Sequence, residues 1–276
     1  MIAENAVDVD KFWRDGYTIV RDVYTKEEIA NLREAAYASK GSGPRDLLSN
    51  PLLRSTLTDG NMAEVARRIL GSSDVWYAGD SSYTINSTGR GWHKDNVDRA
   101  DGKGPDWVGR YTVLRFGIYL QDHYGHTGGL NLRAGSHTVP NNQTGKNIYV
   151  RTRPGDLAVW SLCITHSGNG ALLRFTPWKA PMPTEVPKLK KWKVAKPDGD
   201  RIAIFAAIGL DDSHHHRYTD YLKTRTYMVD AWRGSVYDEE ALAEAAKAGL
   251  NVRNMHDEIE GDETVGKNAD WAPIPY

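Results

Sequence analysis

The stretch GWHKDN at residues 91–96 contains the most informative pattern in the chain, the tripeptide His93-Lys94-Asp95. In an extended segment, side chains two positions apart point to the same side, so His93 and Asp95 can reach one metal ion while Lys94 faces away. Two imidazoles and one carboxylate on one face of an ion leave the opposite face open. That donor set is typical of non-heme Fe(II) oxygenases.

His166 is the candidate for the third ligand. It ends the run DLAVWSLCITH, residues 156–166, whose alternation predicts one buried strand with Trp160 and His166 on the same face. Such a strand would deliver His166 to a site at its end. A His-x-Asp tripeptide alone is weak evidence, because it often arises by chance and an isolated histidine is more often a core or surface residue.

Length and composition favour one soluble globular domain. The chain has 276 residues, of which 26% are charged and 40% hydrophobic, and its formal net charge of −1 gives no general attraction to nucleic acid or to a membrane. The single cysteine, Cys163, excludes an intrachain disulfide. Residues 1–8 have neither the basic nor the apolar region of a signal peptide, and no apolar run approaches the ~20 residues that span a bilayer. A cytoplasmic location is therefore expected.

Helices are predicted at the start of the chain and strands after it. A short helix at 8–15 precedes a strand at 17–23, and the capping-box pattern from Thr25 to Glu28 begins a helix over 26–39 that ends at the GSGP turn, residues 41–44. A further amphipathic segment ends at Gly71. The strand-like runs are 75–86, 111–121, 129–133, 147–152, 156–166 and 201–208. Short strands separated by Gly, Asn, Asp and Pro indicate a sandwich or jelly roll.

Four segments, in order, resemble the phytanoyl-CoA dioxygenase family. They are FWRDGYTIVRDVYTKEEIANLR (12–33), WHKDN (92–96), GGLNLRAGSH (128–137), and PGDLAVW (154–160) leading to HSGN (166–169). The resemblance spans roughly residues 10–230. It implies a double-stranded β-helix, a jelly-roll or cupin-like core with flanking helices, and a metal between the sheets. It also implies that His93, Asp95 and His166 bind Fe(II) as the catalytic centre, with 2-oxoglutarate as co-substrate and O2 as oxidant.

The expected organisation is a single oxygenase domain over residues 1–276. Its helical part covers about 1–72 and its β-helix core about 75–210, with an inserted loop at about 171–199. One more helix, at 238–248, and a polar tail belong to the C-terminal part, about 217–276.

The resemblance also implies an arginine for the distal carboxylate of 2-oxoglutarate. A guanidinium suits this task because it can make two parallel charge-assisted hydrogen bonds. Arg201 opens a good buried strand and is preferred, whereas Arg174 is nearer to His166 but precedes Pro177, which removes a ladder donor. Asn86 and Ser167 are further candidates for the co-substrate, although either could instead satisfy backbone groups in a turn.

The inserted loop is basic, with seven Lys and Arg residues against Glu185 and Asp198. It could act as a lid and attract an acidic substrate, but a solvated surface loop explains the same charges equally well.

Two features outside the loop are also notable. Arg115, if its face lines the interior, needs the co-substrate, the substrate or an acidic neighbour as a partner. His214-His215-His216 is interpreted as an exposed turn rather than a second metal site.

The predicted function is Fe(II)- and 2-oxoglutarate-dependent dioxygenation of a small polar metabolite, with release of succinate and CO2. Hydroxylation is favoured, because Asp95 stands where halogenating relatives carry a small residue. Two alternatives remain: a cupin-type metal enzyme that does not use 2-oxoglutarate, and a non-catalytic ligand-binding relative. The sequence does not identify the substrate.

Overall fold

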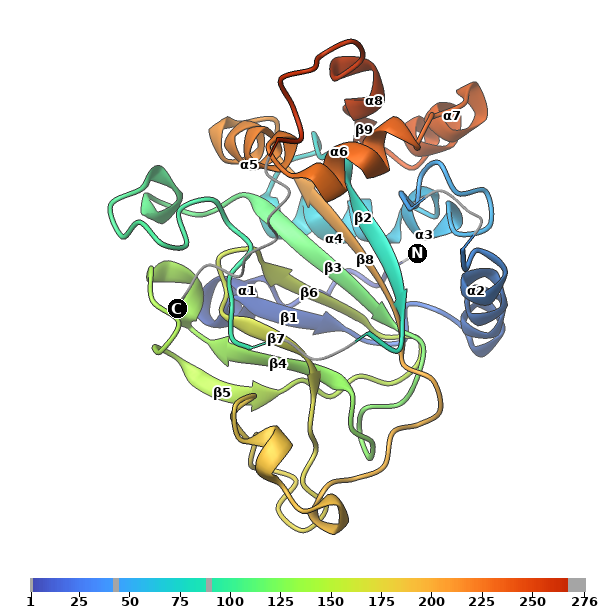
Figure 1. The fold of residues 1–276 in the computed structure, drawn as a ribbon. Helices are drawn as coiled ribbons and strands as arrows, with labels where there is room; N and C mark the ends of the chain where they lie inside the picture. Colours follow the sequence, from blue (N-terminus) through green and yellow to red (C-terminus); the bar gives the residue numbers. More distant parts are fainter. Residues whose placement is uncertain (1, 42–44, 88–90, 268–276) are drawn as a thin grey trace.

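Two β-sheets form the centre of the molecule (Figure 1). The computed structural model describes residues 2–41, 45–87 and 91–267. The larger sheet has the order β1-β6-β3-β8-β2-β9 and the smaller one the order β5-β4-β7. Their bounds are β1 Tyr17–Val20, β2 Trp76–Ile85, β3 Val113–Tyr119, β4 Gly129–Ala134, β5 Lys146–Tyr149, β6 Leu157–Ser161, β7 His166–Gly170, β8 Ile202–Gly209 and β9 Asn251–Val252. Neighbouring strands are antiparallel, except that β9 pairs with β2 in parallel.

Helices from both ends of the chain surround the larger sheet (Figure 1). Their bounds are α1 Val9–Asp15, α2 Lys26–Ala38, α3 Ser55–Thr58, α4 Asn61–Leu70, α5 Ser213–Lys223, α6 Thr226–Arg233, α7 Glu239–Lys247 and α8 Met255–Glu258. The predicted capping box of α2 is present: the Thr25 side chain accepts from the Glu28 N–H, and the Glu28 carboxylate accepts from the Thr25 N–H. The predicted turn at 41–44 and the end of the tail fall mostly outside the described residues. None of the described helices has the length and apolar character that crossing a bilayer requires.

The side chains of β3 alternate between the hydrophobic core and the candidate site. Leu114, Phe116 and Ile118 are fully buried in the cluster that packs the larger sheet against the N-terminal helices. Arg115 and Tyr119 occupy the opposite face, and Tyr119 belongs to the cluster between the two sheets. One face of this strand therefore stabilises the fold, and the other is available to a site.

The predicted fold class, mainly β with flanking helices around a jelly-roll core, is confirmed. Within the described residues the two sheets do not close into one continuous barrel. The predicted single strand over 156–166 is wrong. β6 ends at Ser161, a turn follows, and β7 begins at His166. Leu162 and Cys163 occupy this turn because they pack against the C-terminal helices instead of continuing the sheet.

The C-terminal part contains more helix than the sequence predicted. His214-His215-His216 lies in the first turn of α5 rather than in an exposed turn, and His215 is buried with its ring against the Leu210 carbonyl. The Asp212 side chain caps this helix by accepting from the N–H groups of His214 and His215. The polar residues that favour a turn in the sequence therefore start a helix here.

Candidate functional site

A short backbone bridge brings the predicted ligands together. His93 and His166 exchange two hydrogen bonds, with the His93 N–H 3.0 Å from the His166 carbonyl and the His166 N–H 2.8 Å from the His93 carbonyl. The Asp95 N–H is 3.0 Å from the Leu162 carbonyl. One donor atom from each of His93, Asp95 and His166 lies within 4.8 Å of the other two. Residues 93–95 are thus held extended beside the start of β7, which gives the same-side geometry that the spacing predicts.

Backbone carbonyls orient both imidazole rings. The Nδ1 atom of His93 lies 2.9 Å from the Gly91 carbonyl oxygen, and that of His166 lies 3.1 Å from the Ile164 carbonyl oxygen. A carbonyl can only accept, so each Nδ1 donates to it and each Nε2 is the ring atom that faces the cluster. The Nε2 atoms are 3.9 Å and 3.5 Å from the Asp95 carboxylate oxygens. Ring nitrogens oriented in this way are characteristic of metal ligands.

The charges of the cluster suit a cation. Burial lowers the pKa of His166 to about 4, with His93 adding to the effect, so this ring is neutral at pH 7. Burial alone would raise the pKa of Asp95, but His166, Arg115 and His93 together lower it to about 2. A neutral imidazole and an ionised carboxylate are the protonation states that bind metal.

Lys94 points away from the cluster, as predicted. Its ammonium group is buried and donates to the carbonyl oxygens of Ser136 at 2.6 Å and Cys163 at 2.7 Å. Burial lowers the pKa of Lys94 to about 7. The side chain therefore ties the ligand segment to two neighbouring loops.

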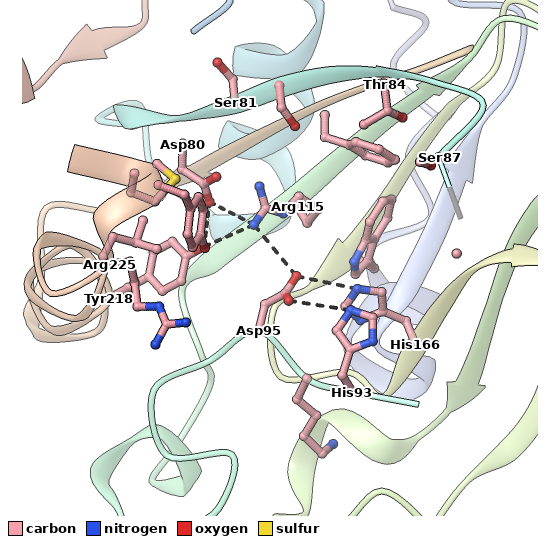
Figure 2. A pocket seen from close by; sticks show the side chains of 18 of the residues that line it. Asp80, Ser81, Thr84, Ser87, His93, Asp95, Arg115, His166, Tyr218 and Arg225 are labelled. Carbon is pink, nitrogen blue, oxygen red and sulfur yellow. Dashed lines mark hydrogen bonds and ion pairs between the residues drawn. The ribbon is translucent and has the colours of Figure 1, made fainter. Parts of the chain in front are cut away.

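Behind Asp95 lies a second layer of charge (Figure 2). Arg115 on β3 is 3.7 Å from the Asp95 carboxylate and 2.8 Å from Asp80 on β2. It also donates to the Tyr218 hydroxyl of α5 at 3.0 Å, and that hydroxyl donates to Asp80 at 2.5 Å. Arg115 thus has the acidic neighbours that its place in the interior requires. The network fixes one side of the Asp95 carboxylate.

The three candidate ligands line a cavity of about 640 Å³, which also contains Arg201. Its volume is in the usual range for small-molecule sites, ~300–1,000 Å³. The walls come from the inner face of the larger sheet, the 91–99 segment, α5 and α6. The rings of Trp160 and His166 are 5.9 Å apart, so an aromatic surface borders the candidate metal position.

Arg201 and Arg174 occupy different surroundings. Arg201 is 7% exposed, and its side chain donates to the Gly128 carbonyl at 2.6 Å and to the Ser87 hydroxyl at 2.9 Å. Its guanidinium lies 5.6 Å from the centre of the Tyr119 ring. Arg174 is exposed and is not among the cavity-lining residues. The structure therefore brings Arg201, and not Arg174, into the cavity with the candidate metal ligands.

Asn86 and Ser167 are adjacent to the cavity but are not among the residues that line it. The Asn86 side chain accepts from the Arg201 N–H at 2.9 Å and donates to Asp200 at 2.7 Å, so it fixes the start of β8. Ser167 is buried and follows His166 on β7, where alternation turns its side chain away from the cavity. Asn86 therefore has the backbone-stabilising surroundings that the sequence left open as the alternative, and the role of Ser167 stays a prediction.

The inserted segment at 171–199 lies beside the smaller sheet. Asn147 donates to the Ala180 carbonyl at 2.7 Å, and Arg151 donates to the Pro177 carbonyl at 2.7 Å. The cavity wall contains none of its residues in the described part of the chain. Residues of α5 and α6 contribute to the wall instead, and the role of the 171–199 segment as a lid stays a prediction.

Sequence reasoning missed the residues that complete the cavity. Asp80 carried a usable signal, since a carboxylate inside a strand-like run needs an explanation. Arg99, Tyr221 and Arg225 carried none, because they come to the cavity only through the packing of the C-terminal helices.

The sequence matches no protein-family model and no curated protein. Solved structures nevertheless align with it. AviO1 from Streptomyces viridochromogenes Tue57 has a TM-score of 0.54 at 17% identity, over 78% of this chain and 97% of that one. The epimerase SnoN in complex with Fe3+, alpha ketoglutarate and nogalamycin RO has a TM-score of 0.52 at 17% identity, over 73% and 82%.

EctD from S. alaskensis with bound Fe has a TM-score of 0.52 at 19% identity, over 75% of this chain and 79% of that one. This chain shares their fold. The likeness agrees with the resemblance to non-heme iron enzymes seen in the sequence, and at this identity it establishes the architecture.

Proposed function

We propose that the protein is a non-heme Fe(II)- and 2-oxoglutarate-dependent dioxygenase that hydroxylates, or otherwise oxidises at a C–H bond, a small polar metabolite and releases succinate and CO2. One observation carries the proposal. His93, Asp95 and His166 converge on the wall of a cavity that also contains a buried arginine. The solved structures of SnoN with Fe3+ and alpha ketoglutarate, and of EctD with bound Fe, support it.

The donor set fits iron. Two oriented Nε2 atoms and one carboxylate are the facial triad of this enzyme class. When bound there, Fe(II) would supply the centre at which O2 is activated, with 2-oxoglutarate as the source of electrons. Asp95 would remain ionised, and the network through Arg115 and Asp80 would hold its carboxylate in one orientation.

Arg201 is proposed to bind the distal carboxylate of 2-oxoglutarate. Two of its five N–H groups are used by Gly128 and Ser87, which fix the guanidinium and leave donors for a carboxylate. Asn86 would position Arg201 through its backbone. A metal enzyme that does not use 2-oxoglutarate would have no need for this arginine.

The substrate would bind between this region and the C-terminal helices. The protein's contribution to rate is placement: the target C–H bond must be held close to the metal while α5 and α6 restrict the entry of water. We propose that the whole chain forms one oxygenase domain, because the N-terminal helices pack the sheet and the C-terminal helices complete the cavity wall.

The test measures O2 uptake and succinate formation by protein supplied with Fe(II) and 2-oxoglutarate, while fractionated metabolite pools are screened for compounds that stimulate both. Asp95→Ala should abolish stimulated turnover and weaken iron binding. Asp220→Ala, which changes a carboxylate with 67% side-chain exposure on α5, is the matched control. Normal substrate-linked succinate formation by Asp95→Ala would refute the proposal.

A further inference from the structure

Arg115 lies between two carboxylates but is closer to one of them (Figure 2). Its Nη2 atom is 2.8 Å from Oδ2 of Asp80 and 3.7 Å from Oδ2 of Asp95. Charged nitrogens and carboxylate oxygens that share a hydrogen bond are usually about 2.7–2.9 Å apart. Arg115 is therefore in direct contact with Asp80, whereas it attracts Asp95 from beyond hydrogen-bond distance.

The Asp95 oxygen that faces Arg115 also faces a candidate metal ligand. Oδ2 is 3.5 Å from Nε2 of His166, and Oδ1 is 3.9 Å from Nε2 of His93. A guanidinium that bonded to Oδ2 would occupy a lone pair of this oxygen and bring a positive charge next to a bound cation. Arg115 and a metal ion would then compete for Asp95. The affinity for the ion thus depends on what holds Arg115 away.

Asp80 and Tyr218 hold Arg115 together. The Tyr218 hydroxyl of α5 accepts from Arg115 at 3.0 Å and donates to Asp80 at 2.5 Å, so the three side chains form a closed set of contacts. Tyr218 is buried, and Arg115 and Asp80 are nearly so. Charged contacts with little access to water are stronger than those at the surface. This set fixes the guanidinium on the side away from the candidate ligands.

The larger sheet brings Asp80 to Arg115 across an intervening strand. β8 lies between β2 and β3, and its residue opposite Arg115 is Ala207, whose small side chain leaves room for a contact across the strand. The register of β2 against β8 shifts just before residue 81, and Gly79 there has a left-handed φ of +72°. Such shifts redirect side chains and are common beside functional sites. The position of Asp80 is therefore built into the fold.

We propose that Asp80 is a positioning residue for the metal site. By binding Arg115, it keeps the guanidinium off Asp95, so that both Asp95 oxygens stay available to a divalent cation. Asp80 is outside the group of candidate ligands and acts through Arg115. This inference rests on the proposed function for the identity of the ligands. Without the Asp80 charge, Asp95 would be the carboxylate nearest to Arg115 in the cavity lining.

The test titrates metal-free protein with Co(II) by calorimetry, because Co(II) accepts the same nitrogen and oxygen ligands as Fe(II). Asp80→Asn should weaken Co(II) binding by about tenfold or more, as is usual for residues that support a metal ligand. In an Arg115→Met background, Asp80→Asn should change the affinity by less than about threefold, because no guanidinium is released. An equal loss in both backgrounds would overturn the proposal.

A crystal structure of metal-free Asp80→Asn protein separates release of Arg115 from a general disturbance of the site. Arg115 should lie within about 3.2 Å of Asp95, a hydrogen-bond distance, and a guanidinium that stays at the present 3.7 Å would contradict the proposal. Asp238→Asn is the matched control. Asp238 is 2.9 Å from the buried Arg54 but does not line the cavity, so this variant should bind Co(II) as the wild type does.

Tyr218→Phe provides the same test if Asp80→Asn does not fold. It removes the hydroxyl that bonds both Asp80 and Arg115 but changes no charge, so it loosens Arg115 without altering the electrostatic attraction for a cation. Co(II) binding should weaken by about threefold or more, the size of one hydrogen bond, and only while Arg115 is present. Unchanged Co(II) affinity in this variant would overturn the proposal.

The two proposals fail in different ways. If the wild-type protein binds neither Co(II) nor, without oxygen, Fe(II), the proposed function falls and this inference falls with it. If the wild type binds Co(II) and Asp80→Asn binds it equally tightly, this inference alone is overturned and the proposed function stands.

Discussion

Arg115 provides the sharpest test of how the site is built. Its guanidinium is 2.8 Å from Asp80, and the two side chains are only 12% and 14% exposed, so this is an ion pair with little access to water. Arg115→Met keeps the length of the side chain but removes the charge. Asp80 would then be a nearly buried carboxylate whose remaining close donor, within the described residues, is the Tyr218 hydroxyl.

We expect Arg115→Met to lower the free energy of unfolding by about 3–5 kcal/mol, the usual cost of removing one partner from a buried pair. Asp80→Asn in the same chain removes the uncompensated charge, so the double variant should recover about 1.5 kcal/mol or more of that loss. Urea denaturation of the metal-free protein measures both. A surface pair is the control: Arg14 is 2.9 Å from Asp15 but 67% exposed, so Arg14→Met should cost much less than Arg115→Met.

The reasoning would be wrong if Arg115→Met cost no more than Arg14→Met, or if the double variant were as unstable as Arg115→Met alone. The first result would mean that water reaches the pair and screens it. The second would mean that Arg115 acts mainly through packing rather than through charge.

Three further predictions concern other parts of the molecule. Arg201→Leu should raise the KM for 2-oxoglutarate by about ten- to a hundredfold, the equivalent of one to two charge-assisted hydrogen bonds, whereas Arg174→Leu should leave it unchanged in steady-state kinetics. Burial, with help from Arg201, lowers the pKa of His123 from 6.5 to about 3. Its contribution to stability is therefore complete above pH 6.5 and is lost as the pH falls toward 3, by about 1.4 kcal/mol per pH unit, so His123→Asn should flatten the acid limb of a plot of unfolding free energy against pH. Thr25→Ala, which removes the cap of α2, should cost about 1 kcal/mol in urea denaturation, and a loss below ~0.3 kcal/mol would contradict the role of the cap.

The sequence predicted the candidate metal ligands because their geometry is local. His93 and Asp95 share a side of an extended segment, and the alternation of β3 placed Arg115 and Tyr119 on one face. Glycine, proline and capping residues mark many element ends, so α1, α2 and the strands other than β6, β7 and β9 were found within a few residues. Four segments in the same order as in the family made the prediction of an iron site specific, which the His-x-Asp tripeptide alone could not do.

The missed features depend on contacts between distant segments. The break between β6 and β7 contains Leu162, Cys163 and Ile164, apolar residues that look like a continuing strand but pack into two different clusters. The start of α5 is so polar that it resembles a turn, and the docking of Tyr218 and Leu222 against the body, with the Asp212 cap, stabilises a helix instead. Packing of this kind overrides local pattern.

The strand order of the larger sheet also bears on how the chain folds as the ribosome makes it. β1 pairs with β6, and β2 pairs with β8, so each early strand awaits a partner encoded far downstream. Until residues 202–209 have emerged, the apolar faces of α2 and α4 have no complete sheet to cover, and a nascent chain would expose them. We expect truncations before β8 to bind chaperones or aggregate, and synthesis of the full sheet to be a late, cooperative event.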